Sequence, residues 1–392
     1  MHVLWCGPYF SDRALLEKRA PNQAAAKWSR GLLSALRAQG VQITVISHCP
    51  EQLWPRGRIF WQDSSPVWFL SGDACTRIGY PNLPIIRERY LDSMYARAAR
   101  NIFSSQKIDA VICYNSLHSF HVAVMKVAYK RGIPSIPIIL DGDDPRQDAW
   151  TKILRDTRFA AGVVFLSWWG SQNFPARNIQ PVLHLDGGAE AWNGGEALSE
   201  KETGHIFKLV YTGALDLWRG LGLMRGIVKK CARRDVRFVL CGKYERERMW
   251  NEFDCDDRVD VRGFVAEDEL RSICLGADVF LNVRDPQIGD NILNYPSKIP
   301  QYLSWGHPVV STWIDSFSPE YRDILQVPVD DSVEAYVTKI NEVLDWEPAQ
   351  RVAHFCRIQK WFCERKMWEA QAKRFHDFVQ ILSSQSVREK VK

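Results

Sequence analysis

Residues 294–312 read N-Y-P-S-K-I-P-Q-Y-L-S-W-G-H-P-V-V-S-T, a pattern typical of a short helix followed by a buried strand. Pro296 suits a first helical position, because its missing N–H is one that a helix start leaves without a partner anyway. Gly306 ends the helix, and the Pro-Val-Val-Ser-Thr run after it is typical of a short parallel strand. Ser297 and Lys298 are therefore expected at a helix N-terminus, where backbone N–H groups, the helix dipole and a lysine together favour an anionic phosphate.

This stretch resembles the P-S-K-x-x-E-Y-x-x-x-G-x-P-V-V element of the nucleotide-sugar-dependent glycosyltransferases with the two-domain GT-B fold, specifically the large retaining family 4 (glycosyl transferases group 1). In that family the lysine holds the donor diphosphate and the glutamate binds the nucleotide ribose. The resemblance gives the first role to Lys298 and places Gln301 at the glutamate position. A glutamine still accepts a hydrogen bond from a ribose hydroxyl, more weakly than a carboxylate does. The family's other glutamate, eight residues earlier, is replaced by Leu293.

The composition is that of an ordinary globular protein. The length of 392 residues suits about two domains, and 46% hydrophobic with 25% charged residues is an average balance. No apolar run approaches the ~18 residues that a membrane helix needs. The first ten residues read as a strand running into a loop rather than as a secretory signal. We therefore expect a cytoplasmic protein, either free or at the inner face of the membrane.

Charge and cysteine usage narrow the partners further. The formal net charge is only +5, which is too small and too dispersed for a nucleic-acid partner, but it suits an anionic donor or loose peripheral contact with an anionic membrane. Ten cysteines are scattered from Cys6 to Cys363 without a C-x-x-C pair, so reduced thiols in the core are expected rather than disulfides or a metal site.

Strand-like runs alternate with helical periodicity along the chain, which predicts parallel sheets covered by helices. The predicted strands of the first half are residues 2–6, 43–47, 110–114, 135–140 and 162–166, and a helix is predicted over residues 24–39. Residues 186–205 contain five glycines and few large aliphatic residues, so they are the best linker candidate. The predicted strands of the second half are residues 208–211, 237–241, 259–262, 279–282 and 308–311.

Two α/β halves of similar size are what the GT-B architecture requires. The predicted fold class is therefore α/β, with two doubly wound Rossmann-like domains facing a central cleft. The first domain, on the acceptor side, is expected to cover residues 1–190, and the nucleotide-sugar domain residues 206–365. Residues 352–382 have a long helical pattern that resembles the C-terminal helix of this family, which crosses back to the first domain. The first domain would be completed by about residues 366–385.

Residues 211–220, Y-T-G-A-L-D-L-W-R-G, follow a predicted strand, so they lie where a ligand at the carboxyl edge of the sheet would lie. They resemble the family's v-G-R-L-x-x-x-K-G element. Gly213 matches its first glycine, Arg219 replaces its lysine and Ala214 replaces its arginine. The resemblance implies that Arg219 and Lys298 neutralise the donor diphosphate, whose charge is about −2, without a metal. A solvated arginine in a turn is the alternative for Arg219.

Two further segments carry the resemblance towards the nucleotide base. Residues 237–244, R-F-V-L-C-G-K-Y, resemble the family's strand that ends in glycine, here Gly242. The later G-F-V-A-E-D-E-L run resembles the element that brings the base against backbone, with Phe264 and Val265 flanking it. Core packing is the alternative for these residues. Arg284, on the loop before the Pro-Ser-Lys motif, is a further candidate for sugar contacts.

In the first half, candidate residues follow the predicted strands. Asn115 takes the register at which many relatives carry a histidine that contacts the transferred sugar, and His118 is a second candidate; a helix cap and a core residue are the alternatives. Gly7 would allow close approach of the acceptor or of the donor phosphate. Asp141 lies on the acceptor side, within a run of aspartates at 141, 143 and 144 that favours a turn over a metal site.

The predicted function is transfer of a sugar, such as a hexose, from a nucleotide diphosphate sugar to a saccharide or lipid-linked acceptor, with retention. Synthesis of cell-surface polysaccharide or glycoconjugate is the expected context. Catalysis is assigned to Arg219, Lys298, Asn115 and His118, with no metal and no cofactor beyond the donor. Two alternatives stay open: a catalytically weak GT-B-fold binding or scaffold protein, suggested by Gln301 and Ala214, and a sugar-nucleotide epimerase.

Overall fold

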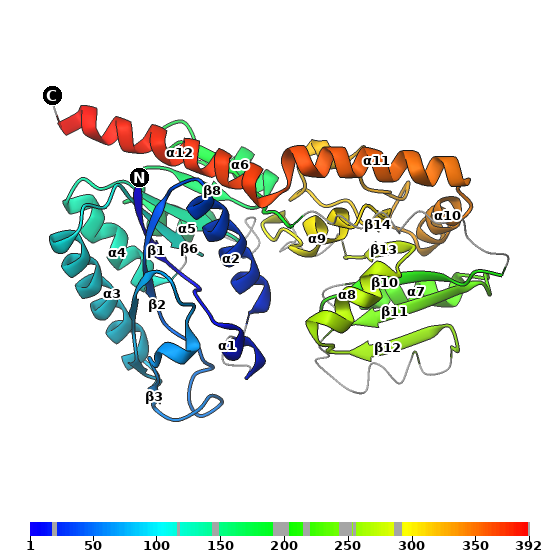
Figure 1. The fold of residues 1–392 in the computed structure, drawn as a ribbon, viewed down its shortest axis with the longest axis horizontal. Helices are drawn as coiled ribbons and strands as arrows, with labels where there is room; N and C mark the ends of the chain where they lie inside the picture. Colours follow the sequence, from blue (N-terminus) through cyan, green and yellow to red (C-terminus); the bar gives the residue numbers. More distant parts are fainter. Residues whose placement is uncertain are drawn as a thin grey trace. The chain divides into compact units, whose positions relative to one another are not determined.

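The computed structural model describes residues 1–17, 22–115, 118–142, 149–190, 204–214, 220–242, 253, 256–285 and 292–390. The chain divides into two compact units (Figure 1). Unit 1 contains Met1–Gly188, Ile292–Tyr295 and Trp368–Lys392, and unit 2 contains Ala189–Asn291 and Pro296–Met367. Each unit is an α/β body with its own parallel sheet, which confirms the predicted fold class.

Unit 1 is built on a seven-stranded parallel sheet with the order β4-β2-β1-β6-β7-β8-β9. Its strands are short apolar runs that are mostly buried on both faces, as the helix-covered strands of parallel sheets are. Their bounds are β1 His2–Cys6, β2 Gln42–Ser47, β4 Ala74–Arg77, β6 Ala110–Tyr114, β7 Ser135–Ile139, β8 Val163–Phe165 and β9 Val182–His184. The five strands predicted for this half are all present, each within a residue or so of the expected bounds.

Helices cover both faces of this sheet (Figure 1). The apolar face formed by Leu4, Val111 and Cys113 packs on α3 (Ile86–Ser105) and α4 (Ser119–Lys130). On the other face, α2 (Gln23–Ala38) places the ring of Trp28 5.4 Å from that of Tyr114. The shorter helices are α1 Asp12–Leu16, α5 Ala149–Thr157 and α6 Trp168–Asn173.

The C-terminal helix α12 (Trp368–Lys390) packs against α2, as predicted for a helix that crosses back to the first domain. The ring centroids of Trp28 and Trp368 lie 5.8 Å apart at 89°. Gly31 leaves room for this contact, because a Cβ there would lie 2.1 Å from the Trp368 ring.

A second, small sheet was not predicted. Its antiparallel strands are β3 (Trp61–Gln62) and β5 (Tyr80–Pro81), and they lie between β2 and α3 in the sequence. Two-residue strands carry too little periodicity to be read from sequence.

Unit 2 contains a five-stranded parallel sheet with the order β12-β11-β10-β13-β14. The strands are β10 Phe207–Thr212, β11 Val236–Cys241, β12 Val259–Gly263, β13 Val279–Asn282 and β14 Val309–Ser311. Helices α7 (Leu221–Lys230) and α10 (Val333–Leu344) share one apolar cluster with β10 and β11. The remaining helices are α8 Glu267–Leu275, α9 Lys298–Ser304 and α11 Pro348–Arg365.

The long helical pattern predicted over residues 352–382 is two helices, α11 and α12, separated at Lys366 and Met367. Tertiary contacts explain the break. The buried Lys366 pairs through Nζ with Glu320 at 2.8 Å, and its carbonyl accepts a hydrogen bond from the backbone N–H of Ala189 at 3.1 Å. Two of the four points where the chain passes between the units, at residues 188–189 and 367–368, are therefore held together by a hydrogen bond within unit 2.

A four-residue segment inside the range 206–365 belongs to unit 1. Ile292–Tyr295 pack with unit 1, where Leu293 is buried in an apolar cluster with Ile139 and Phe165. The Oδ1 atom of Asn294 accepts a hydrogen bond from the backbone N–H of Gly142 at 2.9 Å. Leu293 is apolar, so its burial in this cluster favours the packing of residues 292–295 with unit 1. The glutamate that the family carries at this position would lose its hydration there at a cost.

Candidate functional site

The carboxyl edge of the unit 2 sheet is lined by glycines. The strand order reverses between β10 and β13, which is the point where open α/β sheets bind ligands. The three neighbouring strands β10, β11 and β12 end at Gly213, Gly242 and Gly263, all with positive φ (124°, 154° and 67°). Their backbones are joined by hydrogen bonds from Gly213 N to Cys241 O (2.9 Å) and from Gly242 N to Gly263 O (2.7 Å).

Gly242 is required by its close approach to Gly213. A Cβ on Gly242 would lie 1.7 Å from the carbonyl oxygen of Gly213, so no other residue fits there without moving the backbone. The result is an edge made of main chain, to which a ligand can come closer than side chains would allow. We call Gly213, Gly242 and Gly263 the glycine edge.

Lys298, the first residue of α9, lies beside this edge. Its Nζ atom is 3.9 Å from the position that a Cβ of Gly213 would take, and it donates a hydrogen bond to the carbonyl of Thr212 at 3.2 Å. The ammonium group also lies 3.6 Å from the centroid of the Tyr211 ring, a cation–π distance. The structure thus brings together the two residues, Gly213 and Lys298, that were predicted on separate loops 85 residues apart.

Tyr302 holds the end of β10 in place, a role that sequence analysis missed. Its hydroxyl accepts a hydrogen bond from the backbone N–H of Thr212 at 2.7 Å and lies 3.0 Å from the Thr212 hydroxyl. Its buried ring stacks on Phe280 of β13 at 4.3 Å. Burial raises the pKa of Tyr302 well above its usual value, so the hydroxyl keeps its proton at neutral pH. The sequence signal that could have revealed this role is the tyrosine of the family's P-S-K-x-x-E-Y element, which Tyr302 matches.

Ser297 and Gln301 lie on the same short helix as Lys298. Ser297 is exposed at the N-cap of α9 and its side chain makes no capping hydrogen bond. Gln301 is half-buried one turn further on. Leu293, by contrast, lies in the core of unit 1.

The residues predicted to contact the base follow the glycine edge directly. Phe264, next to Gly263, exposes 63% of its surface, and Val265 is half-buried. The core-packing alternative therefore does not hold for Phe264, since a core phenylalanine would be buried.

Arg284 follows β13 on the other side of the switch point. Its backbone N–H donates to the Thr312 hydroxyl at 2.9 Å, and that hydroxyl donates to the Arg284 carbonyl at 3.0 Å. Gly220 packs closely on this segment, because a Cβ at Gly220 would lie 2.7 Å from the carbonyl oxygen of Val283. Arg219 lies outside the described residues.

The carboxyl edge of the unit 1 sheet gathers the acceptor-side candidates, because β1, β6 and β7 are neighbours. Gly7 follows β1, and a Cβ there would lie 2.5 Å from Cβ of Tyr114, so packing alone requires this glycine. Asn115 follows β6 with φ 54°, and its Oδ1 is buried without a hydrogen-bond partner among the described residues. Asp141 is exposed after β7.

Three histidines surround the end of β6, two of which sequence analysis did not assign. His121 is buried, and its Nδ1 lies 3.3 Å from Asn115 O, so it holds the turn that contains Asn115. The ring of His118, the N-cap of α4, stacks on Phe120 at 5.1 Å, and the loss of water there lowers its pKa. His48 bonds through Nδ1 to the Tyr95 hydroxyl at 2.7 Å, and burial lowers the pKa of His48 to about 3. No sequence motif marked His48.

Within the described ranges, no three His, Cys, Asp or Glu side chains lie together in a way that could hold a metal ion. Of the aspartate run, Asp143 and Asp144 lie outside those ranges. The nine described cysteines are free thiols, six of them buried. In the same part of the chain, no helix is both long and apolar enough to span a bilayer.

Part of the chain matches a known protein family. Residues 206–345 match the family described as "Glycosyl transferases group 1". This region lies in the second half of the chain and contains the glycine edge and Lys298, so the resemblance that the motifs indicated is confirmed. No curated protein matches the chain.

Solved structures match almost the whole length of the chain. Sucrose-phosphate synthase from Thermosynechococcus elongatus is 12% identical, with 98% of this chain and 100% of that chain covered and a TM-score of 0.67. HepE from Anabaena, in complex with UDP and glucose, is 13% identical, with 98% and 100% covered and a TM-score of 0.60. A Listeria monocytogenes protein assigned as a UDP-N-acetylglucosamine 2-epimerase is 10% identical, with 95% and 94% covered and a TM-score of 0.55.

At these identities the matches establish the fold, which is GT-B. The family match in the second half and this fold together support a glycosyltransferase. The epimerase-like structure shares the fold, so the fold alone does not separate sugar transfer from epimerisation.

Proposed function

We propose that this protein transfers a glycosyl group from a nucleotide diphosphate sugar to a saccharide or lipid-linked acceptor, with retention. The observation that supports this most directly is the position of Lys298 beside the glycine edge: a cation next to bare main chain at the switch point of a parallel sheet suits a diphosphate. Synthesis of a cell-surface polysaccharide or glycoconjugate is the proposed context, in the cytoplasm or at its membrane face.

In this proposal the second unit binds the donor. The Lys298 ammonium and the Arg219 guanidinium neutralise the diphosphate and stabilise the negative charge that develops as the sugar–phosphate bond breaks. Ser297, Gly213 and Gly242 line the phosphates. Phe264 is exposed at the end of the glycine edge, where its ring can stack on the nucleotide base, and Gln301 reaches the ribose. No metal is assigned a role.

The acceptor side is assigned to unit 1. Asn115 offers the sugar an amide whose buried Oδ1 has no hydrogen-bond partner in the described part of the chain, which is the property expected of a group that a ligand satisfies. Its left-handed backbone is tolerated by asparagine and is fixed by the hydrogen bond to His121. His118, Asp141 and Gly7 complete the proposed acceptor edge.

Incubation with a panel of labelled nucleotide sugars tests the proposal, with and without candidate saccharide acceptors. A glycosyltransferase releases nucleoside diphosphate by transfer or by slow hydrolysis. An epimerase would change the sugar while it stays attached to the nucleotide, and a scaffold protein would bind donor and change nothing. Release of nucleoside diphosphate that Lys298→Ala abolishes supports transfer; donor binding without release or conversion contradicts it.

A further inference from the structure

Exposed hydrophobic side chains are concentrated in one part of unit 1. Fourteen large hydrophobic residues are exposed in the described part of the chain, and six of them fall between residues 54 and 86: Trp54 (49% exposed), Ile59 (68%), Phe60 (60%), Trp61 (51%), Ile85 (76%) and Ile86 (51%). Single exposed hydrophobic residues are normal on a protein surface, but a cluster of them is typical of an interaction site.

The buried side chain of Asn82 joins these residues into one surface. Its amide nitrogen donates to the carbonyl of Gln52 (2.8 Å) and to that of Arg58 (3.2 Å), and its backbone carbonyl accepts from Trp54 N at 3.2 Å. Its backbone N–H bonds to Phe60 O. Ile85 and Ile86 follow three and four residues later, where α3 begins. In Figure 1 this region lies where β3 is labelled, at the lower end of α3.

Ile85 is held in an unfavourable conformation that keeps its side chain in solvent. It is the N-cap of α3 with φ 67° and ψ −43°, and it makes no side-chain capping hydrogen bond. A β-branched residue at positive φ is a rare outlier, and isoleucine is among the poorest N-cap residues. Local stability would favour asparagine or glycine at this position, so the exposed isoleucine is best explained by something it contacts.

Arginines surround these side chains. Arg56, Arg58 and Arg89 are exposed, and within the described residues none of them has an ion-pair partner. Two carboxylates lie in the same region: Glu88 pairs with Arg87 at 3.3 Å, and Glu51 accepts from Arg58 N at 3.5 Å and keeps its charge. The four arginines at 56, 58, 87 and 89 outnumber Glu51 and Glu88, so the net charge of residues 51–62 and 80–90 is positive.

We propose that this surface, formed by residues 54–61 and 85–89 and called here the tryptophan–arginine surface, docks onto an anionic lipid bilayer. Tryptophan rings suit the boundary between headgroups and acyl chains, and the isoleucines and Phe60 enter the apolar layer. Arginines keep their guanidinium groups among anionic headgroups while their stems lie along the apolar region.

A bilayer fits this surface better than a protein partner does. In residues 51–62 and 80–90, which the structure describes in full, no buried side-chain nitrogen or oxygen lacks a hydrogen-bond partner, so nothing there requires directional bonds. Non-directional burial combined with attraction to negative charge is what a membrane surface supplies. The proposal does not depend on glycosyl transfer, so either one can fail alone.

Co-sedimentation of the full chain with phosphatidylcholine vesicles, with and without phosphatidylglycerol, tests the docking. We expect binding to the anionic vesicles that weakens as salt is added. Trp54→Ser/Trp61→Ser should weaken it by about tenfold or more. Arg56→Gln/Arg58→Gln should weaken it by about fivefold for each arginine on anionic vesicles only. The control Tyr129→Ser/Ile179→Ser removes exposed side chains elsewhere in unit 1 (63% and 85%) and should change nothing.

Ile85→Gly separates docking from misfolding, because it removes the exposed side chain at a backbone conformation that glycine adopts without steric cost. The melting temperature should therefore not fall, while vesicle binding should fall. A lack of binding to anionic vesicles would overturn the proposal, as would an equal loss in the Tyr129/Ile179 control. A concentration-dependent dimer that Trp54→Ser/Trp61→Ser abolishes would overturn it too, because the surface would then be covered by a second copy of the chain.

Discussion

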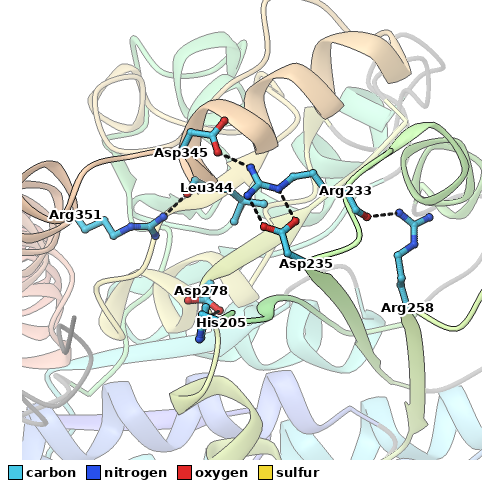
Figure 2. Close-up of polar contacts among 8 residues, drawn as sticks. All are labelled: His205, Arg233, Asp235, Arg258, Asp278, Leu344, Asp345 and Arg351. Carbon is cyan, nitrogen blue, oxygen red and sulfur yellow. Dashed lines mark hydrogen bonds and ion pairs between the residues drawn. The ribbon is translucent and has the colours of Figure 1, made fainter. Parts of the chain in front are cut away.

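The two edges of the unit 2 sheet are built from the same strands and differ in what they present. At the carboxyl edge, three strands end in glycines that present main chain, with Lys298 beside them. At the opposite, amino edge, the strands are preceded by charged residues that bond to one another (Figure 2). The first edge presents bare main chain, whereas the charged groups at the second bond to one another.

The amino edge is a network of paired charges. Arg233 bonds to both oxygens of Asp235 (2.9 and 2.6 Å) and to Asp345 at 2.5 Å, which ties the start of β11 to the end of α10. Arg351 of α11 donates to the carbonyl of Leu344 at 2.5 Å, and Arg258 donates to the carbonyl of Arg233 at 2.8 Å. The His205–Asp278 pair, 3.0 Å apart, lies nearby in Figure 2.

The comparison of the two edges indicates that charged residues in unit 2 serve two purposes, stability at the amino edge and donor chemistry at the carboxyl edge. At the amino edge the charged residues drawn in Figure 2 bond to an opposite charge or to a carbonyl, so these contacts contribute to stability. At the carboxyl edge, substitutions should affect donor chemistry and leave stability nearly unchanged. The predictions below test this separation.

Replacing Lys298 should have the largest effect. Lys298→Ala removes one of the two proposed diphosphate cations. The fall in kcat/KM should correspond to a loss of about 2–4 kcal/mol of transition-state stabilisation, and the melting temperature should stay nearly unchanged. Steady-state kinetics and thermal unfolding measure the two. Lys230→Ala is the matched control, since Lys230 pairs with Glu334 on the surface at 2.9 Å. Arg219→Ala should behave like Lys298→Ala; if only one of the two matters, the pairing of these cations is wrong.

His354 should make the amino edge sensitive to acid. Its buried ring lies 4.7 Å from Trp346, and burial, helped by Arg357 and His307, lowers the pKa of His354 to about 4. An unfolded histidine titrates near 6.5, so its contribution is complete above about pH 6.5 and is lost as the pH falls towards 4. The loss in the free energy of unfolding should be about 2–3 kcal/mol.

Urea unfolding at pH 7 and pH 4.5 measures this loss, and His354→Gln should remove it. The buried histidines of unit 1, His48 and His121, remain in the variant and titrate in both proteins, so the difference between the two pH profiles isolates His354. Identical profiles would show that the ring is hydrated in solution.

Arg233→Ala should reverse the outcome expected for Lys298. It breaks the ion pairs with Asp235 and Asp345 and should cost about 1–2 kcal/mol of stability, a modest value because these carboxylates are 45% and 66% exposed. Arg234→Ala is the control, because that side chain is 83% exposed and its contact with Asp257 is long, at 4.0 Å. Donor turnover at a temperature where both proteins are folded should equal that of the parent; a large loss would mean that the two edges are coupled.

The sequence predicted ten strands of the two parallel sheets but missed β4 and β9, the two edge strands of the unit 1 sheet, and it predicted the tertiary exceptions poorly. The strand at residues 279–282 was predicted with its observed bounds, because a short apolar run that follows Asp278 and ends at Asn282 has few alternatives. The break at Lys366 was missed, because only the partners Glu320 and Ala189 interrupt that helical pattern.

The same limit applies to the candidate site. Gly213 and Lys298 could be placed together because the carboxyl ends of parallel strands share one edge of the sheet. Tyr302 was passed over because its hydrogen bonds to Thr212 depend on tertiary packing. Leu293 was expected on the donor side by its spacing from Gln301, and local spacing did not reveal that it packs in unit 1. The roles of Arg219, Phe264 and Asn115 remain predictions.

Gln301→Glu should give a small gain in nucleotide affinity at the carboxyl edge. If Gln301 occupies the ribose position, a carboxylate should tighten nucleotide binding by about 1 kcal/mol, because a charged hydrogen bond is worth about 1.5–3 kcal/mol against roughly 1 for a neutral one. Titration calorimetry with the free nucleoside diphosphate measures it. Unchanged or weaker binding would place the ribose elsewhere, for example beside Arg284.

Chelation should have the smallest effect of all. The proposed site gives the diphosphate two protein cations, and a third cation would bring little further gain once the charge of about −2 is neutralised. Donor turnover measured with and without a chelator of divalent ions should therefore agree. Loss of turnover that magnesium or manganese restores would overturn the metal-independent proposal. It would also make Asp141, Asp143 and Asp144, which follow β7 of unit 1 in the sequence, candidate metal ligands.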